Sequence, residues 1–545
     1  MLAVRVEAGD PALRGNQPNG LLEGLQARFS AHSHTRGMSA GGTVAEIGTA
    51  VVIGGGVGGL SAAIQAATLG IPVTLLERAD RVGGKMRELS IGGRPVDSGP
   101  TVMTMRWAFE QLFAATGREL GNYVEFAPLE LLARHAWPDG SRLDLFADIE
   151  ASAAAIEAFA GPRDAEGYRR FCAHGERIFA TVEQPFLRSA RPSMTSVVTA
   201  KGLRGALDFA RIDWHRSMWR ALADFFEDPR LRQLFGRYAT YYGSSPFRAP
   251  ATLNLIAHVE RVGVWRVVGG MYRVAEALER LAIELGVVIR SGCEVSEIVV
   301  EDGRAVAVRL ASGERLAAAA VIVNAAPQAL DEGRFGANVR DCVGLSRDAE
   351  RSLSAVTWSA LARTRKFPLA HHNVFFSRDY PEEFRALERG ELIHEPTVYV
   401  HAQDRVESLG THGDAWSEPE RLLILVNAPP RGDAARAIGD LDALERRSFG
   451  LLRACGLELD VIEAQRTAPE QFEQLFPATG GALYGFANHS MMDPFRRPAA
   501  RTKLARLYLA GGGAHPGAGI PMVCLSGQLA GRAVAEDLGV QTQRP

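Results

Sequence analysis

The segment from Thr49 to Glu77 constrains the fold more than any other, because it has the order of a dinucleotide-binding βαβ unit. Ala50 to Ile53 is a short apolar run rich in β-branched residues, which predicts a buried parallel strand. A glycine cluster follows, then helical apolar spacing from Leu60 to Leu69 and a second predicted strand from Val73 to Leu76. Glu77 closes the unit.

Gly54, Gly56 and Gly59 have the G-x-G-x-x-G spacing. Gly54 permits the tight turn, Gly56 leaves room for a pyrophosphate, and Gly59 lets the helix pack closely on the strand. The N–H groups at the helix start attract phosphates. Glu77 is placed to accept hydrogen bonds from a ribose, and its charge would repel a ribose 2′-phosphate. The alternative is a glycine-rich turn without a ligand.

A second glycine pair indicates which dinucleotide binds. Gly83, Gly84 and Lys85 follow the acid, and Asp97-Ser98-Gly99-Pro100 comes shortly after. An NAD site usually continues into another crossover helix. The pattern instead resembles the flavoenzyme superfamily of amine oxidases and carotenoid desaturases, whose dinucleotide is FAD. The resemblance implies that residues 83–85 lie along the pyrophosphate and ribityl chain; the alternative is two solvent-exposed turns.

Bulk composition excludes several classes of partner. The 545 residues are 46% hydrophobic, and the net charge of −2 gives no electrostatic case for nucleic acid. The five cysteines are scattered and never in C-x-x-C spacing, which argues against a structural metal and suits a reducing cytoplasm. No apolar run in the sequence reaches the length of a membrane span.

The predicted fold class is α/β, with a Rossmann-type FAD-binding domain interleaved with a mixed α+β substrate domain. Residues 1–46 lack the apolar core of a signal peptide and are expected to form a disordered extension, with Met38 as an alternative start. The FAD-binding domain is expected to comprise residues 47–107, 265–327 and 500–545. The substrate domain is expected to comprise residues 108–264 and 328–499.

Periodicity predicts further elements. The stretch from Ala108 to about Glu260 is expected to be helical. Predicted helices are Asp148–Ala160, Glu166–Val182, Arg230–Tyr242, Ala249–Glu260, Tyr272–Leu285, Asp440–Cys455 and Ile520–Leu538. Predicted strands are Val287–Arg290, Ala319–Asn324, Arg421–Asn427 and Leu507–Ala510, with an antiparallel meander of Glu294–Glu301, Ala305–Leu310 and Glu314–Ala317.

A second glycine-rich signature begins at Leu507 and reads LYLAGGGAHPGAGIPMVCLSGQLAGRAVAEDL. Pro521 suits the first turn of the helix that follows the loop. The start of that helix would stabilise an electron-rich reduced flavin by about 0.5–2 kcal/mol. His515 lies in the loop and is the candidate catalytic residue; the alternative is that it fixes the loop geometry.

This loop and helix resemble the C-terminal signature of bacterial phytoene-desaturase-type carotenoid desaturases. The blocks beginning DSGPTVMTMRW at Asp97, RYATYYGSSPF at Arg237, GGMYRVAEALE at Gly269 and FPATGGALYG at Phe476 agree. The resemblance covers residues 50–538. The blocks TMRW, LVNAPP and FPATGGALYG are most similar to the hydroxyneurosporene and methoxyneurosporene desaturases, which introduce the C-3,4 double bond into acyclic 1-hydroxy- or 1-methoxycarotenoids.

The resemblance implies an FAD-dependent oxidoreductase that transfers a hydride from an acyclic carotenoid to the flavin. Because only one dinucleotide fingerprint is present, the flavin is expected to be reoxidised by an external acceptor, not by bound NAD(P)H. Alternatives are a multistep phytoene desaturase, a redox-neutral carotenoid isomerase, or a non-enzymatic isoprenoid escort protein. The predicted cofactor-binding residues are Gly54, Gly55, Gly56, Gly58, Gly59, Glu77, Arg78, Gly83, Gly84, Lys85, Val295, Gly512, Gly513, Gly519, Ile520, Pro521 and Met522; no metal is expected.

A carotenoid is insoluble in water, so a chain without a spanning segment is expected to collect it at the inner face of the membrane as a peripheral protein. The predicted docking helix is Thr199–Phe226, against the alternative of a core-facing helix. Its proposed apolar face is Leu203, Leu207, Ala210, Trp214, Met218, Ala221 and Phe225. Candidates to line a substrate tunnel are Arg237, Tyr238, Tyr241 and Arg248, whereas His489 and Asp493 are expected in a surface loop.

Overall fold

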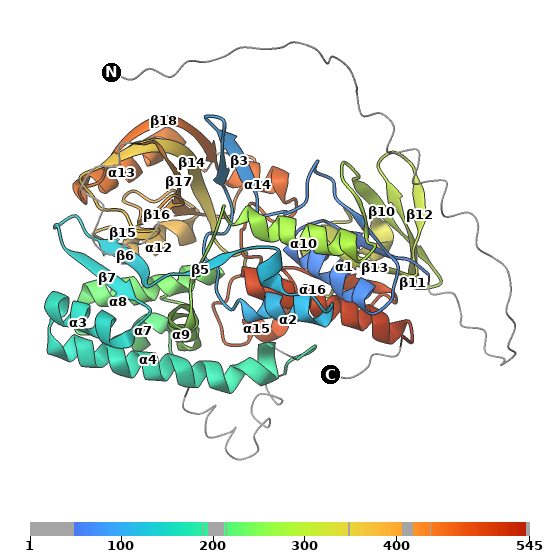
Figure 1. Cartoon of the computed structure of the whole chain (residues 1–545), viewed down its shortest axis with the longest axis horizontal. Coiled ribbons are helices and arrows are strands. Elements are labelled where there is room, and N and C mark those ends of the chain that lie inside the picture. Colours follow the sequence, from blue (N-terminus) through green and yellow to red (C-terminus); the bar gives the residue numbers. More distant parts are fainter. Residues whose placement is uncertain are drawn as a thin grey trace, which may run out of the picture. The chain divides into compact units, whose positions relative to one another are not determined.

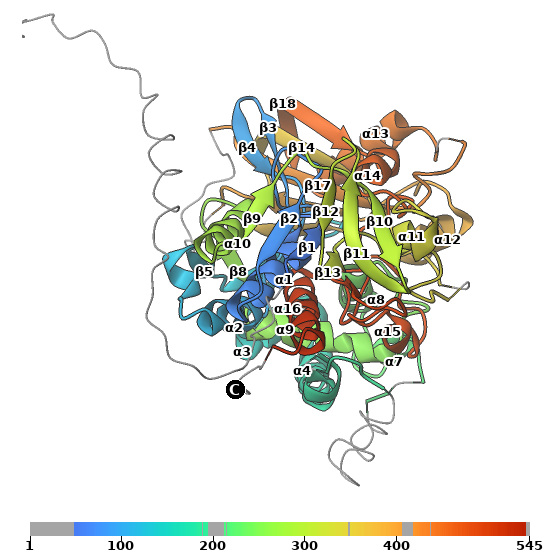
Figure 2. The same cartoon turned by 90° about the vertical axis from the view of Figure 1, so that its right-hand side faces the viewer.

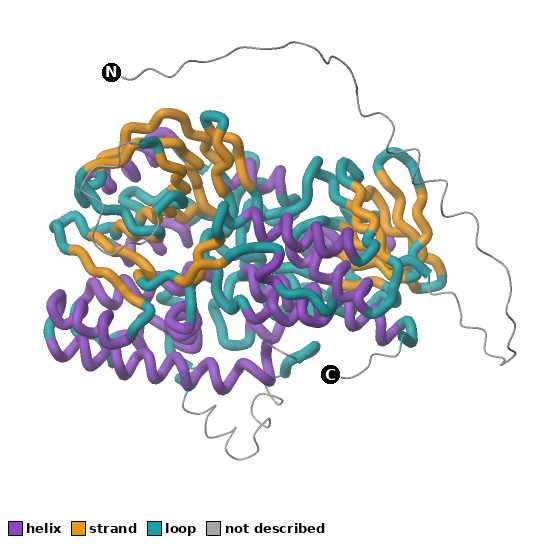
Figure 3. Tube along the Cα trace, in the orientation of Figure 1, coloured by secondary structure: helices purple, strands orange, loops and turns teal. Residues whose placement is uncertain are grey.

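A computed structural model describes residues 48–187, 189–193, 212–213, 215–346, 349–405, 418–436 and 438–540. The predicted N-terminal extension lies outside these residues. The strands gather in two regions, which are joined by loops and covered by helices (Figures 1 and 3). One region holds a parallel sheet, the other a larger mixed sheet.

The parallel sheet confirms the predicted strand–helix–strand unit of residues 50–76. Its five strands have the order β19-β13-β1-β2-β9 and every neighbouring pair is parallel. The strands come from three distant parts of the chain, as an interleaved domain requires. They are β1 (Ala50–Ile53), β2 (Val73–Leu76), β9 (Val288–Arg290), β13 (Ala320–Val323) and β19 (Leu507–Leu509).

Alternate residues of β1 face two different layers. Val52 belongs to a hydrophobic cluster with the helices, and Ile53 to a cluster with the antiparallel meander. Figure 2 shows the helices and the meander on opposite sides of the sheet. The helices are α1 (Val57–Thr68), α2 (Trp107–Ala115), α10 (Tyr272–Glu284) and α16 (Ile520–Asp537), and the meander is β10 (Val295–Glu301), β11 (Arg304–Leu310) and β12 (Arg315–Ala317).

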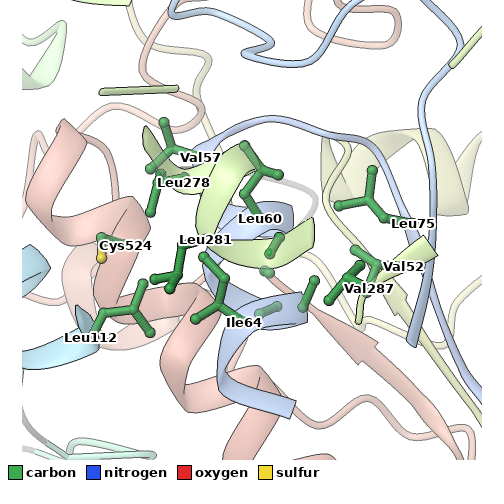
Figure 4. Close-up of a cluster of buried hydrophobic side chains, with 14 of the residues drawn as sticks. Val52, Val57, Leu60, Ile64, Leu75, Leu112, Leu278, Leu281, Val287 and Cys524 are labelled. Carbon is green, nitrogen blue, oxygen red and sulfur yellow. The ribbon is translucent and has the colours of Figure 1, made fainter. Parts of the chain in front are cut away.

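Helix α1 packs against α16 almost backbone to backbone (Figure 1). A Cβ added at Gly527 would lie 2.3 Å from the carbonyl oxygen of Gly58. A Cβ at Gly59 would lie 2.0 Å from the carbonyl oxygen of Gly54, so Gly59 holds α1 against the turn after β1. Side chains of α1, α2, α10 and α16 complete this core, among them Leu60, Ile64, Leu112, Leu278, Leu281 and Cys524 (Figure 4).

The second sheet has seven strands in the order β18-β14-β17-β16-β15-β6-β7. Only the β15–β6 pair is parallel; the other pairs are antiparallel. The strands are β6 (Leu131–Ala136), β7 (Arg142–Phe146), β14 (Ser354–Arg365), β15 (His372–Phe375), β16 (Val398–Ala402), β17 (Glu420–Ala428) and β18 (Glu458–Thr467).

The expectation that the stretch from Ala108 to Glu260 is helical is therefore wrong for β6 and β7. These strands form a hairpin around Pro138-Asp139-Gly140. Asp139 accepts a hydrogen bond from the Ser141 N–H at 2.9 Å, which stabilises the turn. The turn signal is present in the sequence, but the two strands have only six and five residues and are followed by the long helical stretch of residues 149–187.

The predicted helices of this region are present with shifted ends. Asp148 caps α3 by accepting a hydrogen bond from Ala151 N–H, and Asp228 caps α8 in the same way through Arg230 N–H. The predicted helix Arg230–Tyr242 divides into α8 and a 3₁₀ helix, η3. The elements are α3 (Ile149–Ala160), α4 (Pro162–Val182), η2 (Glu183–Leu187), α7 (Met218–Leu222), α8 (Pro229–Gly236), η3 (Arg237–Tyr242), η4 (Ala251–Asn254) and α9 (Leu255–Val262).

The remaining elements connect or cover the two sheets. Small strands are β3 (Glu88–Ile91), β4 (Arg94–Asp97), β5 (Phe126–Pro128) and β8 (Trp265–Val267). Helices are η1 (Leu120–Asn122), α11 (Pro327–Asp331), η5 (Ala337–Val339), α12 (Tyr380–Arg389), α13 (Leu441–Ala454), α14 (Pro469–Leu475) and α15 (Asp493–Arg496). Helix α13 and strand β17 confirm their predictions.

The predicted docking helix Thr199–Phe226 is not supported where the structure describes it. Met218 and Ala221 are fully buried, so they form part of the core and not an exposed apolar face. Residues 194–211 and Trp214 lie outside the described residues. Within the described ranges, none of the helices combines the length and apolar character that crossing a bilayer demands.

Candidate active site

A cavity of about 760 Å³ extends from the carboxyl ends of β1, β2 and β13 to the face of the seven-stranded sheet. One half is lined by glycine turns and the other by side chains of β14, β16 and β17. The carboxyl edge of an open parallel sheet is where such folds bind their ligands. The cavity is therefore the candidate active site.

The first glycine turn forms the wall at the start of α1. Gly54, Gly56 and Gly58 line the cavity. A Cβ at Gly56 would lie 3.0 Å from Asn324 Nδ2 and 3.8 Å from Gly84 Cα, so a side chain there would enter a narrow cradle. Within the described part of the chain, no side chain caps α1, which leaves the N–H groups of its first turn for a ligand.

Glu77 follows β2 and is held by two backbone groups. Its Oε2 accepts a hydrogen bond from Gly55 N–H at 2.6 Å, and its Oε1 accepts one from Ala79 N–H at 2.9 Å. The residue is 8% exposed and lines the cavity. A carboxylate has about four acceptor positions, so it retains capacity for ribose hydroxyls.

Asn324 is a site residue that the sequence analysis missed. It follows β13, lines the cavity, and donates from Nδ2 to the Gly54 carbonyl oxygen at 3.1 Å. Its side chain occupies the space that Cβ atoms at Gly58 and Gly511 would need. The sequence could have indicated this role, because Asn324 lies at the carboxyl end of a buried parallel strand, where such folds bind ligands.

The second glycine pair joins the first turn. The Gly83 N–H donates to the Gly55 carbonyl oxygen at 2.9 Å. Gly83 and Gly84 have φ values of 122° and 59°, which favour glycine, and both line the cavity beside Lys85. Lys85 Nζ donates to the Leu483 carbonyl oxygen at 2.7 Å, and burial lowers the pKa of Lys85 to about 8.

Arg78 and Val295 also line the cavity, beside Glu77 at the outer end of the parallel sheet. Arg78 donates to the Gln474 carbonyl oxygen at 2.9 Å. Asp97 is buried and accepts hydrogen bonds from Met271 N–H at 2.7 Å and Tyr272 N–H at 3.2 Å. Asp97 therefore fixes the start of α10, while Ser98, Gly99 and Pro100 line the cavity.

The C-terminal loop brings a second helix start to the cavity. Gly512, Gly513, Gly519 and Ile520 line it. Helix α16 begins at Ile520, has Pro521 in its first turn, and is capped by no side chain among the described residues. Its positive end is therefore available to an electron-rich ligand.

The other predicted residues lie behind the cavity wall. Gly55, Gly59, Pro521 and Met522 are buried but do not line the cavity. The Nε2 of His515 lies 2.9 Å from the Ser189 carbonyl oxygen, and its ring centroid lies 5.0 Å from that of Phe186. Burial lowers the pKa of His515 to about 4. These contacts suit a loop-fixing role, and a catalytic role stays a prediction.

The substrate half of the cavity has a floor formed by strands β14, β16 and β17, with both apolar and polar side chains. Thr357, Leu425 and Tyr399 are paired across β14, β17 and β16, so they form one row on the sheet. Leu423 and Asn427 lie two positions away along β17 on the same face, and all five residues line the cavity.

The structure separates the four tunnel candidates. Arg237 and Tyr241 line the cavity, whereas Tyr238 lies behind it in a small pocket that also contains Glu260. Arg248 is exposed and pairs with Glu350 at 2.6 Å. His489 and Asp493 also lie away from the cavity, and Asp493 accepts the His489 N–H at 2.9 Å.

The residues present fit a dinucleotide. The uncapped helix start, the glycine cradle and the acid after β2 lie on one wall, as that ligand requires. Fold and site together define an oxidoreductase class whose dinucleotide cofactor would face a largely apolar substrate space.

The comparisons specify this class. The model for the family of flavin-containing amine oxidoreductases matches residues 57–535. The chain is 48% identical over 493 residues to a hydroxyneurosporene desaturase of Rubrivivax gelatinosus, covering 90% of this chain and 93% of the relative. It is 43% identical over 495 residues to a hydroxyneurosporene desaturase of Cereibacter sphaeroides, covering 90% and 98% respectively.

An oxidoreductase from Methanosarcina mazei of known structure has a TM-score of 0.58 at 17% identity, over 90% of this chain and 100% of that chain. That similarity confirms the fold. The chain belongs to the flavin-containing amine oxidoreductase family, within the group formed by the hydroxyneurosporene desaturases. The resemblance found in the sequence is thereby confirmed.

Proposed function

We propose that this protein is an FAD-dependent desaturase that removes two hydrogens from an acyclic 1-hydroxy- or 1-methoxycarotenoid and forms the C-3,4 double bond. The single observation that carries the proposal is the continuity of the cavity. The glycine cradle and the apolar floor of the seven-stranded sheet line the same space. Relatives named for this activity match nearly the whole chain.

In this proposal the first glycine turn and Glu77 hold the adenosine diphosphate part of FAD. Val295 and Arg78 would lie beside the adenosine, and residues 83–85 would lie along the pyrophosphate and ribityl chain. The start of α1 would face the pyrophosphate, and the start of α16 would face the flavin ring. When bound, FAD would supply an oxidised ring that accepts one hydrogen as a hydride, and the neighbouring carbon would release the second hydrogen as a proton.

The protein's own contribution is positioning. Leu423, Leu425 and Tyr399 form a floor that holds the polyene flat and excludes water from it. Because the substrate has no ionisable group near the reacting carbons, orientation accounts for most of the rate enhancement. An external acceptor takes the electrons afterwards.

The substrate resides in lipid, so the protein collects it as a peripheral protein at the cytoplasmic face of the membrane. The burial of Met218 and Ala221 removes the C-terminal part of the predicted docking helix from this role. We assign no other described segment to membrane docking.

Expression in cells that accumulate 1-hydroxyneurosporene, followed by chromatography and mass spectrometry, tests the substrate. The expected product is two hydrogens lighter and absorbs at longer wavelength. Efficient conversion of phytoene to lycopene, with no action on the hydroxylated carotenoid, would instead favour a multistep phytoene desaturase. A product of unchanged mass would indicate an isomerase.

A further inference from the structure

Five cationic residues line the cavity, and four of them have partners in the structure. Lys85 donates to the Leu483 carbonyl oxygen, and Arg87 to Thr467 Oγ1 at 3.2 Å. Arg78 donates to Gln474, and Arg334 pairs with Glu332 at 3.1 Å. The fifth is Arg237, whose guanidinium has neither an ion pair nor a hydrogen bond among the described residues.

Arg237 lies at the start of η3, on the substrate side of the cavity. Its guanidinium carbon is 5.3 Å from the centroid of the Tyr399 ring, and Tyr399 belongs to the floor beside Leu425. The positive charge of Arg237 acts on the buried carboxylates of Glu260 and Glu383, but its N–H donors have no hydrogen-bond acceptor among the described residues, and unpaired donors are costly to bury. Its five N–H donors can only donate hydrogen bonds.

Tyr241 supplies the complementary acceptor. Its hydroxyl donates to the carboxylate of Glu260, which is 7% exposed. Since its proton is engaged, the Tyr241 oxygen presents lone pairs to any further partner. Burial raises the pKa of Tyr241 well above its ordinary value, so the phenol stays neutral.

Little further space lies behind this part of the cavity. A small pocket of about 30 Å³ lies behind it and shares Arg237, Tyr241 and Tyr399 with the main cavity. That volume holds no more than one or two water molecules. The small pocket therefore cannot take up the polyene chain, so carotenoid atoms that contact Arg237 and Tyr241 lie in the main cavity.

We propose that Arg237 and Tyr241 form the binding site for the C-1 oxygen of the substrate, and thereby determine its specificity. The inference rests on the proposed function. In a 1-hydroxycarotenoid the oxygen is attached only two carbons from C-3, so an oxygen site must lie near the reacting bond. A hydroxyl group accepts from Arg237 and donates to Tyr241, whereas a methoxy group can only accept from Arg237.

Binding constants test this without turnover. Flavin fluorescence quenching is measured with 1-hydroxyneurosporene, its 1-methoxy derivative and neurosporene, the hydrocarbon without oxygen, in detergent micelles. Arg237→Met keeps the side-chain length and removes the donors. It should bind both oxygenated carotenoids about 10–100-fold more weakly and neurosporene unchanged, because an unmet polar group discriminates this strongly.

Tyr241→Phe should weaken binding of the hydroxylated carotenoid about 10-fold and leave the methoxylated one nearly unchanged. Arg237→Lys, which keeps a donor, should recover part of the preference. Arg248→Met is the matched control, because Arg248 lies on the surface; it should retain the wild-type preference. Flavin content should be normal in all variants.

If Arg237→Met and Tyr241→Phe both retain flavin and the wild-type preference for oxygenated carotenoids, the oxygen site is wrong while the proposed function stands. If the wild-type protein binds the three carotenoids equally, the oxygen site is also wrong. If it binds and converts none of them, the proposed function fails as well.

Discussion

The Oε2 of Glu77 accepts the N–H of Gly55 at 2.6 Å, which links the acid after β2 to the glycine turn after β1. The other carboxylate oxygen accepts Ala79 N–H at 2.9 Å. The acid and the turn are thus fixed relative to each other by the protein itself. The protein therefore loses little conformational freedom when a ligand binds to both.

Glu77→Gln is expected to weaken FAD binding. An amide has a single acceptor oxygen, so a glutamine that keeps its bonds to the backbone N–H groups has fewer acceptor positions left for the ribose hydroxyls. The expected cost is about 1–3 kcal/mol, or roughly 5–150-fold in Kd. Titration of the apoprotein with FAD measures it. Asp80→Asn, an equal charge change at an exposed neighbour, should leave the Kd within about twofold.

Gly56→Val is expected to abolish flavin binding without unfolding the protein. Gly56 has φ −70°, which valine tolerates, but its Cβ would enter the cradle 3.0 Å from Asn324 Nδ2. The purified variant should lack the flavin absorbance. Gly450→Val is the control, since nothing lies within 4 Å of a Cβ there. Full flavin content in the Gly56 variant would show that the glycine turn does not contact the cofactor.

Gly59→Ala is expected to lower the stability of the folded protein, whether or not FAD is bound. Its Cβ would lie 2.0 Å from a backbone oxygen that cannot rotate away, so α1 must shift from the sheet. Overpacking of this kind typically costs about 1–3 kcal/mol or more. Thermal unfolding should show a lower Tm even with saturating FAD. An unchanged Tm would mean that α1 and the turn are not packed as described.

The buried His135 gives a pH dependence of stability. Burial lowers its pKa to about 4 in the folded state, from about 6.5 when unfolded. Between these values the unfolded chain binds the proton that the folded protein excludes. The contribution of His135 to stability is therefore complete above about pH 6.5 and falls by up to about 1.4 kcal/mol per pH unit down to pH 4.

Replacement of this side chain isolates the contribution of His135. The His135→Gln variant should unfold with a shallower dependence on pH between 6.5 and 4, measured by urea titration at several pH values. His394→Gln serves as the control, because the side chain of His394 is exposed. Equal slopes in wild type and the His135 variant would assign the acid sensitivity to other groups.

The dinucleotide half was predictable because its constraints are local. Strand, glycines, helix and acid follow one another within the segment 49–77, and each has one mechanical role. The substrate half could not be predicted in this way, because its floor is formed by a row of residues from three strands that are distant in sequence. Thr357, Leu425 and Tyr399 become neighbours only through pairing.

Single residues illustrate the same limit. Asn324 follows a correctly predicted strand, but its contact with Gly54 depends on which strands are adjacent. Arg237 and Arg248 belong to one sequence block, and only the fold separates the cavity residue from the surface residue.

The most direct test of the account is a single anaerobic turnover. Purified protein with bound FAD is mixed with 1-hydroxyneurosporene in detergent without any other acceptor, and the absorbance of the oxidised flavin is followed while the carotenoid is analysed. We predict loss of the oxidised flavin band together with an equal amount of carotenoid two hydrogens lighter, with its new double bond at C-3,4. An oxidised flavin that persists while the carotenoid is converted, or a carotenoid that stays unchanged while bound, would contradict hydride transfer from this substrate to the flavin.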